Sequence, residues 1–262
     1  MTTSEGKTNS VASRIVGIDL AASAASTAFA VLADGRLEAV QVDVDDDRLV
    51  DACVHAEKIG IDCPLGWPSA FVAFVTAHST GRPLPVSATT TDRAELVYRE
   101  TDRWVAEHFR PLRPLSVSAD RIAHAALRCA GILQRLGESD RSGLGRVVEV
   151  YPAASLIAWG LSPRRYKGPG GRALREILVN ELSLVVDLGA NGSLCRESDH
   201  ALDAVVAALS ATAAQCGAAT LPGAEQLATA RREGWIAVPT CTLTDPRIGR
   251  PSGSSSGRRG RR

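Results

Sequence analysis

Residues 13–44 read SRIVGIDLAASAASTAFAVLADGRLEAVQVDV, and this stretch decides the fold. Its first nine residues form a short apolar run with β-branched side chains that carries an acid near its end. STAFAVLA (26–33) and RLEAVQVDV (36–44) predict two further strands. The Asp-Gly pair between the last two runs is typical of a tight hairpin turn. The sequence therefore predicts an antiparallel meander, whereas a dinucleotide-binding fold would place a helix directly after the first strand.

The following segments extend this meander into a larger sheet. Residues 45–57 have the spacing of a helix, and KIGIDCPLGWP (58–68) and GRVVEVYP (145–152) read as buried strands that each carry an acid and are stopped by a proline. We expect an α/β fold with a mixed five-stranded sheet flanked by helices, and with a helical insertion (about 69–144) before the last core strand. The element order, β-β-β-α-β-α…β-α, is that of the RNase H-like fold.

Two further helices are predicted from their apolar spacing. Residues 91–109 read as one helix within the insertion, and 198–215 read as the most clearly amphipathic helix of the chain. The apolar stripe of the latter comprises Leu202, Val205, Val206 and Leu209.

The composition, with 45% hydrophobic and 23% charged residues, is that of an ordinary globular protein. The six cysteines are scattered without a C-x-x-C pair, which favours reduced thiols over a disulfide framework or a zinc site. The N-terminus lacks the apolar core of a signal peptide, and no run approaches the ~18 apolar residues of a membrane span. We expect a cytoplasmic protein without a membrane partner, and the sequence leaves its oligomeric state open.

The predicted domain covers residues 13–244, between a disordered N-terminus (1–12) and a disordered Arg-rich tail (245–262). The tail holds six Arg and one Asp, a net charge of +5 in a chain whose total is +1, so residues 1–244 carry −4. Such a tail either attracts nucleic acid weakly or only keeps the chain soluble.

Acidic residues fall at the ends of the predicted strands. Asp19 and Asp62 each follow Gly-Ile, and Glu149 lies in the later strand. These three strands are expected to be parallel neighbours, so their tips bring the acids to one edge of the sheet, where α/β folds bind ligands. Asp62 is alternatively a strand-ending turn residue, and Glu149 is alternatively the partner of a buried arginine.

Two more acids, Asp199 and Asp203, lie four residues apart on the helix 198–215 and border its apolar stripe. Asp199 is alternatively a helix N-cap. Carboxylates gathered at one place raise each other's pKa, and a bound Mg²⁺ or Mn²⁺ removes that cost. The pattern therefore predicts a divalent metal site.

The chain resembles domain-of-unknown-function family 429, a group regarded as predicted nucleases of RNase H-like fold. The matching segments occur in order and are GIDLA (17–21), IGIDCPLGWP (59–68), YRETDR (98–103), VVEVYPAASLIAWGL (147–161), YKG (166–168), SDHALDAVVAALSA (198–211) and REGWIAVP (232–239). The resemblance covers nearly the whole chain except its tails. It implies metal-dependent hydrolysis of phosphodiester bonds in a nucleic acid.

The resemblance also suggests roles for individual residues. Asp19, Asp62 and Asp203 match the acids expected to hold metal, and Glu149 and Asp199 are additional candidates. The basic residues Arg99 and Arg103 of YRETDR and Lys167 of YKG are candidates for binding the substrate backbone, with Asp102 beside them. The alternative for this group is an internal Arg–carboxylate lock that holds the insertion onto the sheet.

Two other classes of function remain open. An ATP-using enzyme of the actin/sugar-kinase type shares this core, and AASAAST (21–27) resembles its phosphate-binding turn, but the chain has room for one copy of a core that such kinases duplicate. A non-catalytic nucleic-acid-binding or regulatory module agrees with the near-neutral charge but not with the retained acids. A serine hydrolase has no support because the chain lacks a G-x-S-x-G elbow, and His200 reads as a residue behind the acids or on the helix surface.

Overall fold

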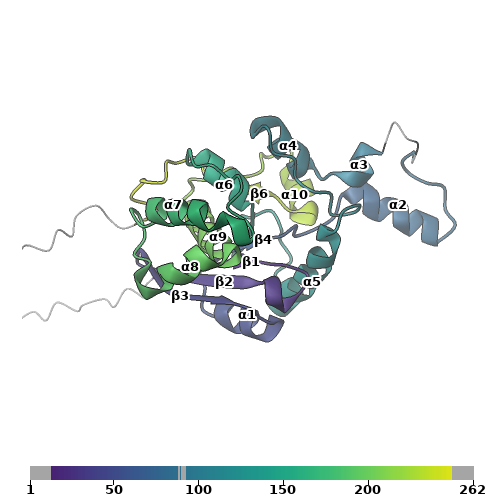
Figure 1. The fold of residues 1–262 in the computed structure, drawn as a ribbon. Helices are drawn as coiled ribbons and strands as arrows, with labels where there is room; N and C mark the ends of the chain where they lie inside the picture. The colour runs from purple at the N-terminus through teal and green to yellow at the C-terminus, as the bar shows by residue number, and fades with distance from the viewer. Residues whose placement is uncertain (1–12, 88, 90–92, 250–262) are drawn as a thin grey trace, which may run out of the picture.

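The computed structural model describes residues 13–87, 89 and 93–249 (Figure 1). Its strands form one sheet in the order β3-β2-β1-β4-β5-β6. They are β1 (Arg14–Asp19), β2 (Ala28–Ala33), β3 (Arg36–Val42), β4 (Lys58–Asp62), β5 (Val147–Val150) and β6 (Ile236–Ala237). The first three strands are antiparallel neighbours, whereas β1, β4, β5 and β6 run parallel.

The turn between β2 and β3 explains the start of the sheet. Asp34 and Gly35 both have positive φ angles, 48° and 72°. Two consecutive residues with positive φ form a type I′ turn, whose twist matches that of the flanking strands. The predicted antiparallel meander is confirmed.

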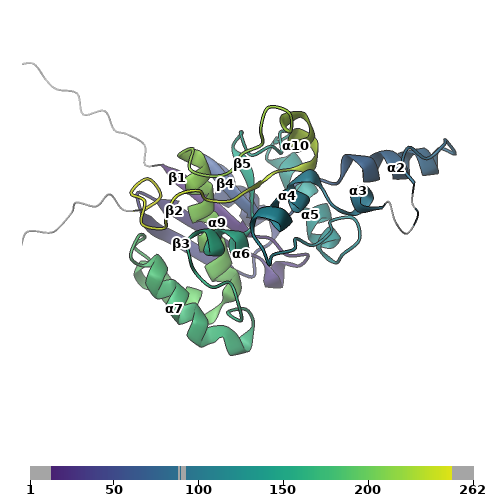
Figure 2. The same cartoon turned by 90° about the horizontal axis from the view of Figure 1, so that it is seen from above.

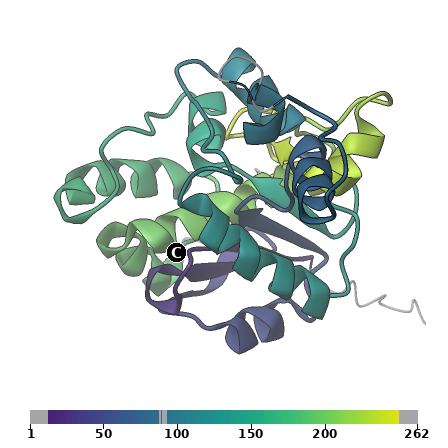
Figure 3. The same ribbon diagram turned by 90° about the vertical axis from the view of Figure 1, so that its right-hand side faces the viewer.

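Helices cover both faces of the sheet. They are α1 (Asp46–Cys53), α2 (Ser69–Ser79), α3 (Ala94–Val97), α4 (Glu100–His108), α5 (Ile122–Arg135), α6 (Pro152–Ala158), α7 (Arg172–Leu182), α8 (Gly192–Glu197), α9 (Asp199–Gln215) and α10 (Leu227–Glu233). Helix α9 packs on one face of the sheet and contacts α6, α7 and α8, and α1 and α5 cover the other face (Figures 1 and 3). Helices α2 and α3 extend away from the sheet (Figure 2).

Two predictions about the sheet and its central helix are wrong in detail. The sheet has six strands, not five, because β6 joins it through a two-residue parallel pairing to β5. Helix α9 is not amphipathic: 13 of its residues are buried, because the sheet lies on one side and other helices lie on the opposite side.

The predicted helix 91–109 is interrupted within its described part. Tyr98 and Arg99 have extended backbone angles between α3 and α4. Asp102 accepts a hydrogen bond from the Arg99 backbone N–H at 2.9 Å and starts α4 anew. The turn sends the Arg99 side chain inward, toward the sheet.

The folded part also extends past residue 244. Ile248 is buried in the core on the α9 side of the sheet, and Asp245 pairs with Arg247 at 2.7 Å. The remainder of the predicted tail (250–262) and the N-terminal segment (1–12) lie outside the described residues.

Candidate metal centre

The two G-I-D segments point their aspartates to the same face of the sheet. Side chains alternate along a strand, so the isoleucines of both segments, Ile18 and Ile61, enter the core beside α1 and α5. The glycine and the aspartate of each segment therefore face α9. The parallel register pairs Asp19 of β1 directly with Asp62 of β4.

The glycines allow α9 to lie directly on the strands. A Cβ atom on Gly17 would stand 2.2 Å from the carbonyl oxygen of Ala204, and one on Gly60 would stand 2.6 Å from that of Ala207. Neither contact is possible for a side chain, so only glycine permits this approach. The helix thereby brings Asp203, the residue before Ala204, over the strand ends.

The three aspartates consequently form one cluster. Asp19, Asp62 and Asp203 each offer a carboxylate oxygen, and these atoms lie within 4.8 Å of one another. Asp19 is 9% exposed and Asp203 is 1% exposed. The predicted convergence of these residues is confirmed, and the arrangement is compatible with metal binding.

Neighbouring side chains orient two of the three carboxylates. Asp203 accepts a hydrogen bond from the Tyr166 hydroxyl at 2.7 Å. It also forms an ion pair with Lys167 Nζ, at 2.7 Å. His200 Nδ1 lies 2.7 Å from Asp19 Oδ2. The carboxylate of Asp62 has no such partner among the residues that the structure describes.

Burial and mutual repulsion make this cluster hard to ionise fully. Burial raises the pKa of Asp62 well above its usual value, and the nearby charge of Asp19 raises it further. Burial also raises the pKa of Asp203 to about 6, against the opposing effect of Lys167. The hydrogen bond to Asp19 raises the pKa of His200. The site therefore favours an additional positive charge, either a proton or a cation.

A cavity of about 280 Å³ opens beside this cluster. Asp62, Lys167 and Tyr151 line it on the side of the aspartates, and Leu115 and Ile122 line it on the side of the insertion. A ligand in this cavity would meet Asp62, the aspartate of the cluster for which the described part of the chain offers no hydrogen-bond partner.

The chain matches, over residues 17–227, a family described as a protein of unknown function (DUF429). It belongs to the DUF429 family. The matched range includes the three aspartates and their partners, whereas Glu233 and β6 lie beyond it. The comparisons with curated proteins and with solved structures gave no match.

Glu149 does not join the aspartates of this DUF429 chain. Its two oxygens each accept a hydrogen bond from Arg99 at 2.7 Å, and one also accepts from the Leu65 backbone N–H at 3.0 Å. Arg99 binds Asp102 in the same two-pronged manner, at 2.7 and 3.1 Å, and donates to the Glu233 carbonyl at 3.0 Å.

Arg99 is therefore used inside the protein. Its side chain is 1% exposed, and all five of its guanidinium N–H groups have acceptors. We call Arg99, Asp102 and Glu149 the arginine lock, because they join α4 to β5 and to the end of α10. This geometry is that of the internal Arg–carboxylate alternative and not of a substrate contact.

Asp199 holds the loop that carries Lys167. Its carboxylate accepts a hydrogen bond from the Gly168 N–H at 3.0 Å, while Ser198 is the N-cap of α9. This bond helps to keep the pKa of Asp199 below its usual value although burial opposes it. Buried Arg175 holds the same loop from beneath, through the carbonyls of Tyr166 and Gly168.

The remaining predicted residue, Arg103, is exposed and donates to the Tyr98 carbonyl at 2.8 Å, away from the aspartates. The structure adds residues whose roles were not predicted. Tyr166 contacts Asp203, and the carboxylate of Glu233 accepts from the backbone N–H groups of Ser69 and Glu100. Both residues lie in segments that the resemblance covers, Tyr166 in YKG and Glu233 in REGWIAVP, and these positions were the only hint of their roles in the sequence.

Proposed function

We propose that this DUF429 protein is a metal-dependent nuclease that hydrolyses phosphodiester bonds of a nucleic acid. The observation that carries the proposal is the convergence of Asp19, Asp62 and Asp203 within 4.8 Å at adjacent strand ends. Three carboxylates face the single positive charge of Lys167 and a histidine, so the cluster has an excess of negative charge.

The residues present fit a divalent ion. Mg²⁺ and Mn²⁺ prefer oxygen ligands, which the three aspartates supply. Lys167 Nζ already occupies a cation position 2.7 Å from Asp203, and its side chain is 59% exposed, which leaves it room to move. When bound, divalent ions supply the charge that activates water and stabilises the leaving oxygen of a phosphodiester.

The side chains around the cluster have separate roles in this proposal. His200 and Tyr166 hold the carboxylates of Asp19 and Asp203 in fixed orientations. Asp62 faces the neighbouring cavity, where the scissile phosphate would lie. Lys167, which lines the same cavity, could bind a phosphate oxygen once its Nζ leaves Asp203.

We also propose that the fold is RNase H-like. The support is the strand order β3-β2-β1-β4-β5 with an antiparallel meander followed by parallel strands. The acids at the ends of β1 and β4 have the positions that the resemblance implies for metal ligands. In the described part of the chain, no helix is long and apolar enough to span a membrane.

The test is a cleavage assay with single-stranded, duplex, hybrid and branched substrates. We expect cleavage with Mg²⁺ or Mn²⁺ and none with a chelator, and a loss on the order of 10³-fold in Asp62→Asn. Asp51→Asn, which changes an exposed aspartate on α1, is the matched control.

Other outcomes would contradict the proposal. Cleavage that survives Asp62→Asn would place the chemistry elsewhere. Hydrolysis of ATP without cleavage of nucleic acid would favour the kinase-like reading, and metal-independent binding without cleavage would favour a non-catalytic module.

A further inference from the structure

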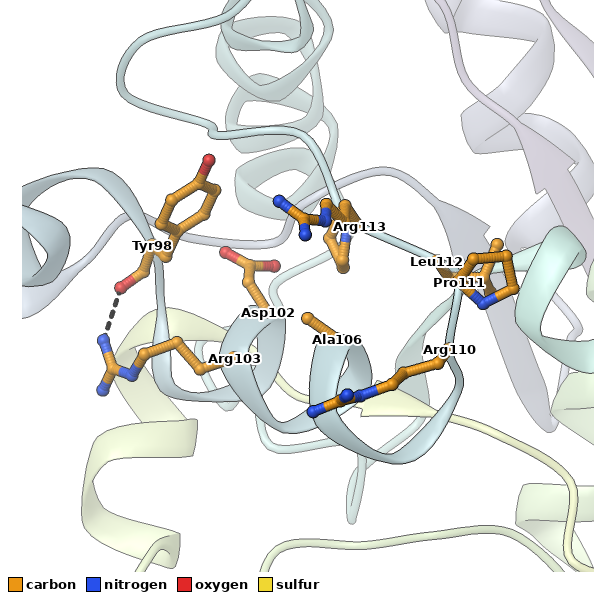
Figure 4. A pocket seen from close by; sticks show the side chains of 9 residues that line it. Tyr98, Asp102, Arg103, Ala106, Arg110, Pro111, Leu112 and Arg113 are labelled. Carbon is orange, nitrogen blue, oxygen red and sulfur yellow. Dashed lines mark hydrogen bonds between the residues drawn. The ribbon is translucent and has the colours of Figure 1, made fainter.

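A second, larger pocket lies beside α4, on the insertion. It has a volume of about 480 Å³, and its polar lining includes Arg103, Arg110 and Arg113 together with Tyr98 and Asp102. Figure 4 shows Arg113 above and Arg110 below, with Ala106 between them and Asp102 on the side of Tyr98. All three arginines are exposed. We call this the arginine pocket.

The arginines of this pocket have no acidic partner among the residues that the structure describes. Neither Arg110 nor Arg113 has an ion pair or a side-chain hydrogen bond within the described residues, and Arg103 donates only to the Tyr98 carbonyl. Asp102 is the one acid of the lining, and both of its oxygens are already bound by Arg99. A chain with a net charge of −4 over residues 1–244 thus gathers three guanidinium groups at one place, and none of them has an ion pair within the described residues.

The arginine pocket adjoins the cavity beside Asp62. Asp102 and Pro114 belong to the lining of both spaces. A chain-like ligand that lies at the cavity has the arginine pocket as its neighbour, next to Asp102 and Pro114. A mononucleotide in the cavity would be expected to leave the arginine pocket unused.

We propose that the arginine pocket binds a phosphate of a nucleic acid strand next to the phosphate that lies at the aspartates, an inference that rests on the proposed function. Guanidinium groups bind phosphate through paired N–H donors and stay charged at all physiological pH values. Contacts of this kind fix the register of a strand without reading its sequence.

The other features of the arginine pocket favour a strand over a free phosphate ion. The arginines are exposed around an open pocket, whereas a site for a small anion would need buried donors that enclose it. Tyr98, 38% exposed, presents an aromatic ring beside the guanidinium groups. Aromatic rings next to basic side chains are the surface on which single-stranded bases stack.

The experiment measures binding alone, so that it is independent of catalysis. A fluorescently labelled single-stranded oligonucleotide is titrated with the full chain in chelator, over a series of salt concentrations, and anisotropy is recorded. The variants are Arg110→Gln/Arg113→Gln and Arg110→Lys/Arg113→Lys. Arg36→Gln, on the exposed side of β3 at the opposite edge of the sheet, is the matched control.

We expect the Gln double variant to bind on the order of tenfold more weakly than wild type. Its salt dependence should flatten by about 1.4 in the slope of log K against log salt, since each single-strand phosphate contact contributes about 0.7. The Lys variant should keep the slope and lose part of the affinity, and Arg36→Gln should match wild type.

Unchanged binding in the Gln variant, an equal loss in Arg36→Gln, or no binding by wild type would overturn the inference. Competition by inorganic phosphate or a mononucleotide at the concentration of strand phosphates would show a small-anion site and overturn the assignment to a strand. The titration contains chelator, so it measures binding without cleavage. If the protein binds in this manner but shows no cleavage in the separate assay with Mg²⁺ or Mn²⁺, the proposed function is contradicted and the inference about the arginine pocket still stands.

Discussion

The aspartate cluster and the arginine lock are two buried acidic sites at the ends of neighbouring strands, and they differ in how their charge is balanced. In the lock, one guanidinium satisfies two carboxylates with hydrogen bonds of 2.7–3.1 Å. In the cluster, three carboxylates share one lysine and one histidine, and Asp62 has no partner among the described residues. A satisfied network holds structure together, whereas an unsatisfied one is suited to a ligand.

The largest expected effect breaks the lock. Arg99→Met leaves the carboxylates of Glu149 and Asp102 buried without a counterion, and we expect a loss of about 3–5 kcal/mol in the free energy of unfolding. Denaturant unfolding measures it. Arg103→Met, an exposed change in α4, should stay within about 0.5 kcal/mol of wild type. A loss below about 1 kcal/mol in Arg99→Met would mean that the lock does not hold the insertion in place.

The pH dependence of the free energy of unfolding tests the charge balance of the aspartate cluster. The pKa of Asp203 is about 6 in the folded protein and near 3.8 when unfolded, so between these values the folded state binds more protons. Metal-free wild type should therefore lose stability as pH rises from 4 to 6. Between pH 4 and 6, the free energy of unfolding of wild type should fall by on the order of 2 kcal/mol more than that of Asp203→Asn. Urea unfolding of both proteins in chelator checks it, and a pH-independent difference would contradict the account.

A smaller effect is expected from the packing that assembles the cluster. Gly17→Ala forces the backbone of α9 away from β1 and should cost roughly 1–3 kcal/mol in the free energy of unfolding. The control is Gly131→Ala on the open side of α5, where a Cβ meets nothing within 4 Å and should be neutral or stabilising. Equal behaviour of the two variants in thermal melts would show that close approach of α9 is not required.

The sequence predicted the aspartate cluster better than the lock, for physical reasons. Asp19 and Asp62 repeat the same Gly-Ile-Asp pattern on strands, and the parallel register of β1 and β4 pairs the two aspartates. The lock joins Arg99 to Glu149 across 50 residues, and nothing local distinguishes it from a substrate contact. The burial of α9 depends on helices that cover its far side, which an alanine-rich pattern does not show.

The most direct test of the central claim is anomalous diffraction from a crystal soaked in Mn²⁺. We predict a peak within bonding distance, roughly 2–2.6 Å, of oxygens from Asp19, Asp62 and Asp203, with Lys167 Nζ moved away from Asp203. The same soak of Asp62→Asn should show a weaker peak or none. Absence of a peak at these aspartates in wild type, with Lys167 still paired to Asp203, would contradict the assignment of this site as a metal centre.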